Sequence, residues 1–303
     1  MDNILLLFLC LILGFLFKKS KTFPKDTALV LNKFVIYISL PAMALYYLPK
    51  VELSEKLLFP IGVAWIGFLL SFIVFSSLGK WLGWSKSLIG CTILMGGLGN
   101  TSFVGIPVIE ALYDKEGLET LVLVDLPGTF IALSTVGILV AATYSRGEAN
   151  FNQIGKRILG FPPFLAFCVG FMCILFKIEM PETLDGVFEN LAATVTPLAL
   201  VSVGFQLSIE KRSKHWGFVV LVLTQQLIIW PLVILLFYKT VLGQSGTAID
   251  VCVMEAGMAP MITAAIVCNA YGLKPKLSNM IVSIGIPLSF VTLAFWYWIL
   301  TLV

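Results

Sequence analysis

Hydrophobic residues occur along this chain in blocks of about 17 to 25, a length that crosses a bilayer as a helix, and short polar segments separate the blocks. Each block predicts a transmembrane helix. The blocks cover approximately residues 2–17, 27–48, 57–79, 87–112, 118–144, 161–177, 184–207, 216–240, 247–271 and 278–302. The pattern therefore predicts an all-α membrane protein with ten transmembrane helices.

The composition agrees with this interpretation, since 59% of the 303 residues are hydrophobic and 12% are charged. A soluble domain has about twice that share of charge. The first block has Asp2 as its only preceding charge and is followed by Lys18, Lys19 and Lys21. A signal peptide carries its positive charge before the apolar run, so we expect a retained first helix.

Lysine and arginine are unevenly divided between alternate loops. The loops after the odd-numbered helices contain Lys18, Lys19, Lys21, Lys25, Lys80, Lys86, Arg146, Lys156, Arg157, Lys211, Arg212, Lys214, Lys274 and Lys276. The remaining loops contain Lys50, Lys56, Lys115, Lys177 and Lys239. Positive loops stay in the cytoplasm, so this bias predicts an integral membrane protein with both termini outside.

A weak internal similarity divides the chain into two halves, with offsets from 154 to 160 residues. The matched positions include Pro24 with Pro181, Pro41 with Pro197, Tyr113 with Tyr271, and Pro127 with Pro287. This predicts a first five-helix repeat (1–144), a cytoplasmic linker (145–160) and a second repeat (161–303). Five is an odd number, so the second repeat is inverted in the membrane, an architecture typical of secondary transporters.

The equivalent helices 4 and 9 are both interrupted in the middle. Helix 4 contains LMGGLGNTSFVGIPVIEAL (94–112), and helix 9 contains Gly257 and Pro260. Proline and glycine free backbone groups that hydrocarbon cannot satisfy, which is tolerated only inside protein or along a wet cavity. Two facing breaks offer carbonyls to a cation and helix N-termini to an anion, so we predict a binding site there. A single proline kink is more often a packing feature.

Carboxylates within the membrane are informative because each costs at least ~2.5 kcal/mol to insert. Glu110 lies near the outer end of helix 4 and can reach water. Asp125 lies in helix 5, a short way in from the outer surface, and Glu255 lies five residues before Pro260. These two favour a coupling cation, Na⁺ or H⁺. The remaining amides within the predicted helices are interpreted as contacts between helices. They are Asn190, Gln206, Gln225, Gln226 and Asn269.

No enzyme site is apparent. The single histidine, His215, lies in a charged loop, and the six cysteines lie in apolar runs without a C-x-x-C pair. The Asn-Thr-Ser triplet at 100–102 is too deep for glycosylation, and the surrounding glycines lack the strand–turn–helix unit of a nucleotide-binding loop. We expect no cofactor other than Na⁺ and no nucleic acid partner.

NTSFVGIP (100–107) resembles the N-T-x-x-x-G-I-P motif in helix 4 of the auxin efflux carrier family. FVIYISLPAMAL, EAGMAPMITAAIVCNAYGLKPKL and GIPLSFVTLAFWYWIL resemble helices 2, 9 and 10 of that family. The similarity covers essentially the whole chain, and the short central loop resembles that of bacterial members, which implies a location in the bacterial inner (plasma) membrane. It implies an elevator-type fold related to the bile acid sodium symporters, with crossed helices 4 and 9. It also implies a homodimer that carries organic acid anions such as auxin, malate or malonate.

The resemblance also implies roles for individual residues. The substrate-contacting asparagine of the family falls on Asn100, and its crossover proline in helix 4 falls on Pro107. In helix 9 the family has proline directly after methionine, whereas here Ala259 follows Met258 and Pro260 comes one residue later. EAGM (255–258) resembles the sodium-binding stretch of the bile acid symporters, which implies Na⁺ at Glu255.

We therefore expect a cation-coupled transporter of a small carboxylate, acting by symport or antiport. The predicted substrate-binding residues are Asn100, Thr101, Ser102, Pro107, Met258, Pro260, Ser39 and Thr196. The predicted cation-binding residues are Glu255, Asp125, Asn100, Ala256 and Met258. The alternatives are an uncoupled uniporter and a non-transporting sensor or scaffold built on a transporter fold.

Overall fold

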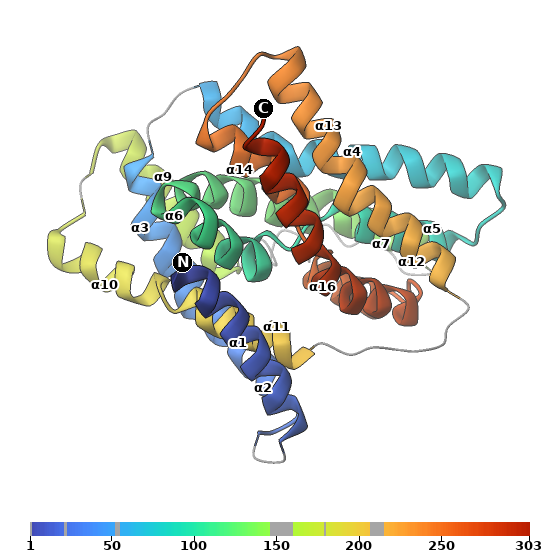
Figure 1. The fold of residues 1–303 in the computed structure, drawn as a ribbon, viewed down its shortest axis with the longest axis horizontal. Coiled ribbons are helices and arrows are strands. Elements are labelled where there is room, and N and C mark those ends of the chain that lie inside the picture. The colour runs from blue at the N-terminus through green and yellow to red at the C-terminus, as the bar shows by residue number, and fades with distance from the viewer. Residues whose placement is uncertain (1, 21–22, 52–54, 146–159, 179, 207–214) are drawn as a thin grey trace.

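The structure is a computed structural model that describes residues 2–20, 23–51, 55–145, 160–178, 180–206 and 215–303 (Figure 1). Within these ranges every regular element is a helix, and one isolated β-bridge joins Gly99 to Pro260. The predicted all-α class is confirmed. Most of the predicted linker (145–160) lies outside the described residues, as do Lys21, Arg146, Lys156, Arg157, Lys211, Arg212 and Lys214.

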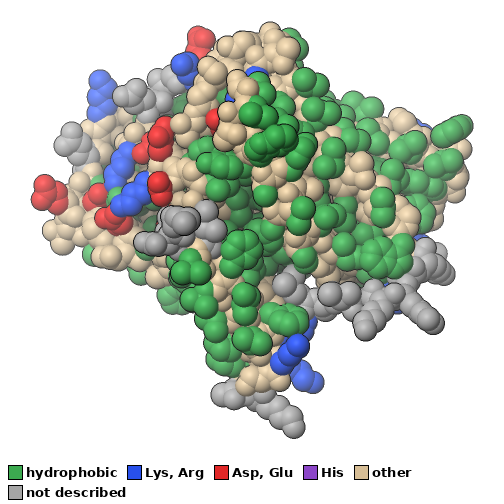
Figure 2. Space-filling view, in the orientation of Figure 1, with side chains coloured by type: hydrophobic (Ala, Val, Ile, Leu, Met, Phe, Trp, Pro, Cys, Tyr) green, Lys and Arg blue, Asp and Glu red, His purple; other side chains and the backbone are tan. Residues whose placement is uncertain are grey.

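Six helical segments of the described chain are long and apolar enough to cross a membrane. They are Thr27–Lys50, Glu55–Trp81, Thr101–Tyr144, Glu182–Gln206, Trp216–Val241 and Pro275–Leu300. Two shorter apolar helices cover Lys86–Gly97 and Pro162–Phe176. Figure 2 shows hydrophobic side chains over the middle of one face, while acidic and basic side chains gather near its upper left edge. Such a surface suits an integral membrane protein.

The α-helices of the first half are α1 (Asp2–Lys19), α2 (Thr27–Phe34), α3 (Leu40–Tyr47), α4 (Leu58–Trp81), α5 (Lys86–Gly97), α6 (Ile106–Leu123) and α7 (Ile138–Tyr144). Those of the second half are α9 (Pro162–Phe176), α10 (Glu182–Ala192), α11 (Val195–Gln206), α12 (Trp216–Thr224), α13 (Trp230–Leu235), α14 (Thr247–Ala256), α15 (Ile262–Ala270) and α16 (Pro275–Leu300). Short π-helical turns join several of them: η1 (Val35–Ser39), η4 (Thr101–Gly105), η5 (Val124–Phe130), η6 (Leu133–Gly137), η7 (Gln225–Ile229) and η8 (Leu236–Val241). Two 3₁₀ turns, η2 (Leu48–Lys50) and η3 (Glu55–Leu57), precede α4.

Prolines explain where three of these π turns occur. Pro41, Pro107 and Pro231 each lie at the second position of an α-helix that directly follows a π turn. Proline has no N–H, and its ring clashes with the carbonyl four residues earlier, so the preceding turn widens. The membrane helices thereby change direction without ending.

The helices form two groups that meet at α6 (Figure 1). In the first group, α11 packs along α1 and α2, and α3 packs on α9 and α10. In the second group, α4 packs on α5 and α14, while α15 contacts α5 and α16. Helix α6 contacts α14 of the second group and both α1 and α11 of the first, and η4 contacts α11.

Helices α1 and α11 approach each other through two glycines. A Cβ on Gly14 would lie 2.2 Å from the carbonyl oxygen of Val201, and one on Gly204 would lie 2.2 Å from that of Leu11. Small residues allow this backbone contact, which is a common basis for helix association in membranes. The backbones of α1 and α11 therefore lie in direct contact at these two glycines.

Candidate functional site

Both helices that the sequence predicts to be broken are interrupted in the structure. Helix α5 ends at Gly97, and η4 begins at Thr101 after three non-helical residues. Helix α14 ends at Ala256, and α15 begins at Ile262 after five more. We call residues 98–100 and 257–261 together the crossing.

The two breaks satisfy each other's backbone groups. Gly99 and Pro260 form an antiparallel bridge, in which Asn100 N donates to Ala259 O at 2.7 Å and Met261 N donates to Leu98 O at 3.0 Å. Buried polar backbone groups need partners of this kind. Pro260 lies within the bridge, so the crossing forms even though the proline comes one residue later than in the family pattern.

Four helix ends converge at the crossing. Helices α5 and α14 have their carbonyl ends there, and η4 and α15 have their amide ends there. Some of these groups are paired locally, since Gly257 N donates to Val253 O and Met254 O. The first pair of ends carries partial negative charge and the second pair partial positive charge. The crossing therefore offers surfaces suited to a cation and to an anion, without a fixed positive side chain.

Glu255 lies in the last turn of α14 and is completely buried. A Cβ on Gly105 would lie 2.7 and 2.8 Å from the two carboxyl oxygens of Glu255, so this carboxyl group packs against the η4 backbone. Neither oxygen has a hydrogen-bond partner within the described part of the chain. The negative end of α14 also disfavours a carboxylate there, so the position suits a bound cation or proton.

Asp125 joins η5 to η4. Thr101 Oγ1 donates to Asp125 Oδ1 at 2.5 Å, and Ser102 Oγ donates to the same oxygen at 2.6 Å. Asp125 is 5% exposed. The structure thus brings these three predicted residues together, and both hydroxyl protons point to the carboxylate.

Asn100 is the N-cap of η4. Its Oδ1 accepts a hydrogen bond from Phe103 N at 3.2 Å, which fixes the orientation of the amide. Its Nδ2 is buried and has no hydrogen-bond partner among the described residues. A buried donor without a partner is costly, so Asn100 presents an N–H group that a ligand oxygen would satisfy.

The other predicted residues divide into two places. Ala256, Met258 and Pro260 are buried in or beside the crossing, and Pro107 is buried in the first turn of α6. By contrast, Ser39 Oγ is 2.7 Å from Thr194 Oγ1, and Thr196 donates to Glu110 Oε2. Those bonds lie between η1 and the start of α11, and between α11 and α6. Ser39 and Thr196 are thus engaged with neighbours outside the crossing.

Gln226 contacts the crossing, and the sequence did not predict this role. It is completely buried in η7, and its Nε2 donates to Met258 O at 3.2 Å. From the sequence, Gln226 was interpreted as one of several amides that form contacts between helices, because hydropathy does not show which neighbour an amide faces. Its one local signal is the pair Gln225–Gln226 shortly before Trp230 and Pro231 in an otherwise apolar run.

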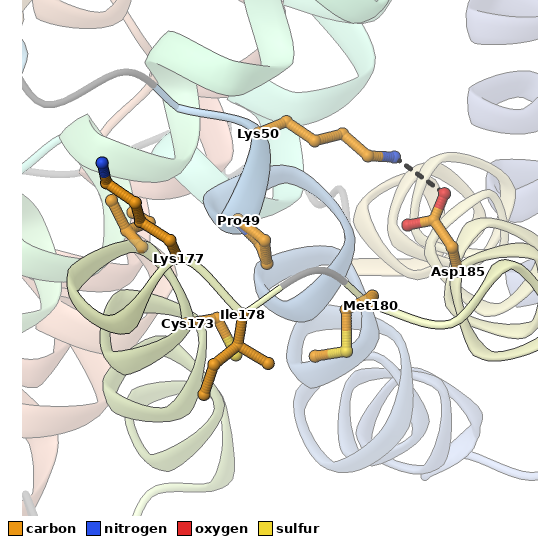
Figure 3. Close-up of a pocket in the computed structure, with 8 residues that line it drawn as sticks. Pro49, Lys50, Cys173, Lys177, Ile178, Met180 and Asp185 are labelled. Carbon is orange, nitrogen blue, oxygen red and sulfur yellow. Dashed lines mark hydrogen bonds and ion pairs between the residues drawn. The ribbon is translucent and has the colours of Figure 1, made fainter.

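A separate cleft of about 410 Å³ lies where η2 meets the end of α9 and the start of α10 (Figure 3). Lys50 Nζ lies 3.1 Å from Asp185 Oδ2, and both side chains are about one-third exposed. Lys177 lies on another side of the cleft, and apolar side chains such as Ile178 line the space between. None of the predicted site residues lines this cleft.

Coordination at the crossing would rely on few side chains. Within the described residues, no group of three or more His, Cys, Asp and Glu could hold a metal ion together. The oxygen atoms that could coordinate a cation are those of the Glu255 carboxyl group and the backbone carbonyls at the helix ends. This set fits a weakly held Na⁺ or a proton, as in the discontinuous helices of secondary transporters.

An all-α membrane protein in which two broken helices cross belongs to the class of membrane transporters. Comparison with known families agrees, since residues 1–297 match the family described as "Membrane transport protein". The chain belongs to this family, and its resemblance to the auxin efflux carriers is thereby confirmed. The family identifies a transporter and not an enzyme.

Two archaeal relatives cover almost the full length. One, named an uncharacterized transporter of Methanocaldococcus jannaschii, is 26% identical over 309 residues, with 99% of this chain and 98% of the relative covered. Another, named an uncharacterized transporter of Methanothermobacter thermautotrophicus, is 26% identical over 300 residues, with 97% and 96% covered. The similarity therefore extends through both broken helices.

Proposed function

We propose that this protein is a secondary active transporter of a small organic acid anion, coupled to a cation. The observation that carries the proposal is the Glu255 carboxyl group, buried against Gly105 without a hydrogen-bond partner in the described chain. A carboxylate in this position is costly unless a cation or a proton accompanies it. Secondary transporters bind ions and substrates where discontinuous helices meet.

The anion subsite of this proposal is the positive side of the crossing. The amides at the starts of η4 and α15 and the Asn100 Nδ2 group would donate to a carboxylate. Thr101, Ser102, Pro107, Met258 and Pro260 shape this side, and Ser39 and Thr196 are the outlying candidates. Because the proposed anion subsite uses backbone amides and Asn100 in place of a lysine or arginine, a monovalent or divalent carboxylate of the auxin or malate type would bind reversibly.

The cation subsite is the negative side of the crossing. Glu255 would carry the charge, the end of α14 at Ala256 and Met258 would supply carbonyl oxygens, and Asn100 and Asp125 would complete the surroundings. Na⁺ and H⁺ are the two candidates. The two Glu255 oxygens, which have no hydrogen-bond partner in the described part of the chain, support either one.

The proposed mechanism is alternating access of the elevator type. The second helix group, with the crossing, would move against the first group along α6 and α11. We further propose ten transmembrane helices in two inverted repeats (1–144 and 161–303), both termini outside the bacterial inner membrane, and a homodimer. The contact of η4 with α11 supports a site at the boundary of the two groups.

Thermal unfolding of the purified protein with a panel of small carboxylates, each in Na⁺ and in K⁺, tests the proposal. A ligand that binds only the folded state raises the apparent stability. We expect a carboxylate-specific rise that increases with Na⁺, and uptake of the same carboxylate into proteoliposomes. Stabilisation without ion dependence would indicate proton coupling or a uniporter. Binding without uptake would favour a sensor or scaffold, and no stabilisation by any anion would contradict the proposal.

Glu255→Gln is the matched variant for the coupling ion, because it keeps the size of the side chain and removes the charge. We expect this variant to fold, to bind carboxylate and to lose all dependence on Na⁺. Undiminished ion-driven uptake by this variant would contradict the assignment of Glu255.

A further inference from the structure

We call the predicted transmembrane helices spans, numbered 1 to 10 along the chain, so that spans 4, 8, 9 and 10 are residues 87–112, 216–240, 247–271 and 278–302. Span 8 also reaches the crossing. Its central part is the π turn η7, which begins with the buried residues Gln225 and Gln226 and is followed by Trp230 and Pro231. π turns inside α-helices are frequently found at functional sites. The turn has a clear local cause in Pro231, which cannot donate a backbone hydrogen bond.

The carbonyl that Pro231 leaves without its usual donor is that of Leu227, four residues earlier. Trp296 Nε1 of α16 donates to Leu227 O at 2.8 Å, so a side chain from span 10 replaces the missing bond. The rings of Trp296 and Pro231 also flank Gly257, since a Cβ there would lie 3.4 Å from Trp296 Cδ1 and 3.5 Å from Pro231 Cγ. Spans 8 and 10 thus enclose the first residue of the span 9 break.

Gln226 contacts the middle of the same break. Its Nε2 donates to Met258 O at 3.2 Å, and a Cβ on Gly99 would lie 3.5 Å from that Nε2. The same Cβ would lie 3.4 Å from Glu255 O. The Gln226 amide therefore lies between the two broken segments, beside the peptide groups that follow Glu255.

We propose that Gln226 is a positioning residue of the crossing, whose amide N–H holds the Met258 carbonyl and thereby the span 9 break in its binding geometry. This inference rests on the proposed function, because it treats the crossing as the binding site. Met258 O follows the end of α14, where the helix supplies no further amide. Without Gln226 this buried carbonyl would lose its donor, and the peptides of residues 257–261 would be less restrained.

Two apolar variants remove the donor in side chains of different shape. Gln226→Met keeps the length and removes both polar atoms, and Gln226→Leu removes them in a shorter, branched side chain. Gln206→Met is the matched control, because among the described residues Gln206 Nε2 bonds to Ser202 of its own helix, at 3.1 and 3.2 Å. The donor role predicts the same defect in both Gln226 variants and none in the control.

The first measurement is residue-resolved hydrogen exchange of the full-length protein without ligand. We expect the Asn100 and Met261 amides of the bridge to exchange about tenfold faster in both Gln226 variants, the ratio for loss of one ordinary hydrogen bond. Exchange in α1 and α11 should stay unchanged. Unchanged exchange at the bridge, or a rise spread evenly over all helices, would overturn the proposal. Wild-type behaviour of Gln226→Leu would also overturn it.

The second measurement is the concentration of Na⁺ and of carboxylate that gives half the maximal thermal stabilisation. Both should rise about tenfold in the Gln226 variants and stay unchanged in Gln206→Met. Normal ligand affinity in variants with fast exchange at the bridge would overturn the link between positioning and binding. If the wild-type protein is stabilised by no carboxylate in either ion, the proposed function fails, whereas the exchange measurement still decides whether Gln226 positions the break.

Discussion

The carboxyl group of Glu255 packs against the backbone of Gly105, although the two residues are 150 positions apart in the sequence. Gly105 is the last residue of η4, and Glu255 lies in the last turn of α14. The bridge between Gly99 and Pro260 holds their two segments together. The candidate cation site therefore depends on both broken helices, and a change in either one should alter ion binding.

Gly105→Ala tests this contact directly. The new Cβ would lie 2.7 and 2.8 Å from the Glu255 carboxyl oxygens, closer than such atoms approach, so the carboxyl group must move. Overpacking of this kind typically lowers the free energy of unfolding by about 1–3 kcal/mol. We expect loss of the Na⁺-dependent stabilisation in a protein that still folds, measured by thermal unfolding. Gly186→Ala is the control, because a Cβ on Gly186 meets no atom within 4 Å. Normal Na⁺ dependence of Gly105→Ala would contradict the site.

Asp125 provides a test of the hydroxyl pair. In Asp125→Asn the side chain keeps an Oδ1 that accepts from Thr101 and Ser102, whereas in Asp125→Leu both hydroxyls lose their acceptor. An unsatisfied buried hydroxyl costs about 1–3 kcal/mol, so the leucine variant should unfold at a clearly lower temperature than the asparagine variant. Equal stability of the two variants would show that these hydrogen bonds contribute little.

Asn100 should matter more than an amide elsewhere in the same fold. Asn100→Ala removes the cap of η4 and the buried Nδ2 donor, and Asn190→Ala changes an exposed residue of α10. We expect the first variant to weaken carboxylate binding by about tenfold or more, because one charge-assisted hydrogen bond is worth about 1.5–3 kcal/mol. Titration calorimetry of both variants measures the difference. Equal losses would argue against the anion subsite.

Two cysteines test how the part of span 4 before its break packs on the part of span 9 after its break. Cys91 in α5 and Cys268 in α15 are neighbouring residues that are both completely buried, on two helices that contact each other. In a variant with the other four cysteines replaced by serine or alanine, we expect a membrane-permeant oxidant to form an intramolecular disulfide between them. Mass spectrometry would detect the linked peptides, and Cys91→Ser is the control. Intermolecular products alone would contradict this packing.

Much of the candidate site could be predicted from sequence. Gly and Pro in helices 4 and 9 indicated the breaks, because both residues act through local backbone geometry. Asn100, Asp125 and Glu255 stood out because polar groups in long apolar runs are costly. Which groups pair with which was not predictable: Thr101 and Ser102 were expected to bind substrate, and in the structure they donate to Asp125.

Gln226 shows why the other contacts of the site could not be predicted from the sequence. Five amides in the predicted helices looked alike in sequence, and all were interpreted as contacts between helices. Gln226 meets Met258 O at the crossing, whereas Gln206 bonds to its own helix and Asn269 Nδ2 bonds to Asn279 Oδ1. Composition and periodicity describe one helix at a time, and the difference between these amides lies in their neighbours.

The sequence by itself determined that this protein is an all-α membrane transporter with two interrupted helices. Those properties follow from hydropathy, from backbone conformations that glycine and proline allow, and from a family motif in one continuous segment. Only the tertiary structure decided that Pro260 joins Gly99 in a bridge, that Glu255 packs on Gly105 and that span 8 supplies Gln226. These contacts join residues more than 30 positions apart, so their geometry depends on how whole helices pack and not on any local preference.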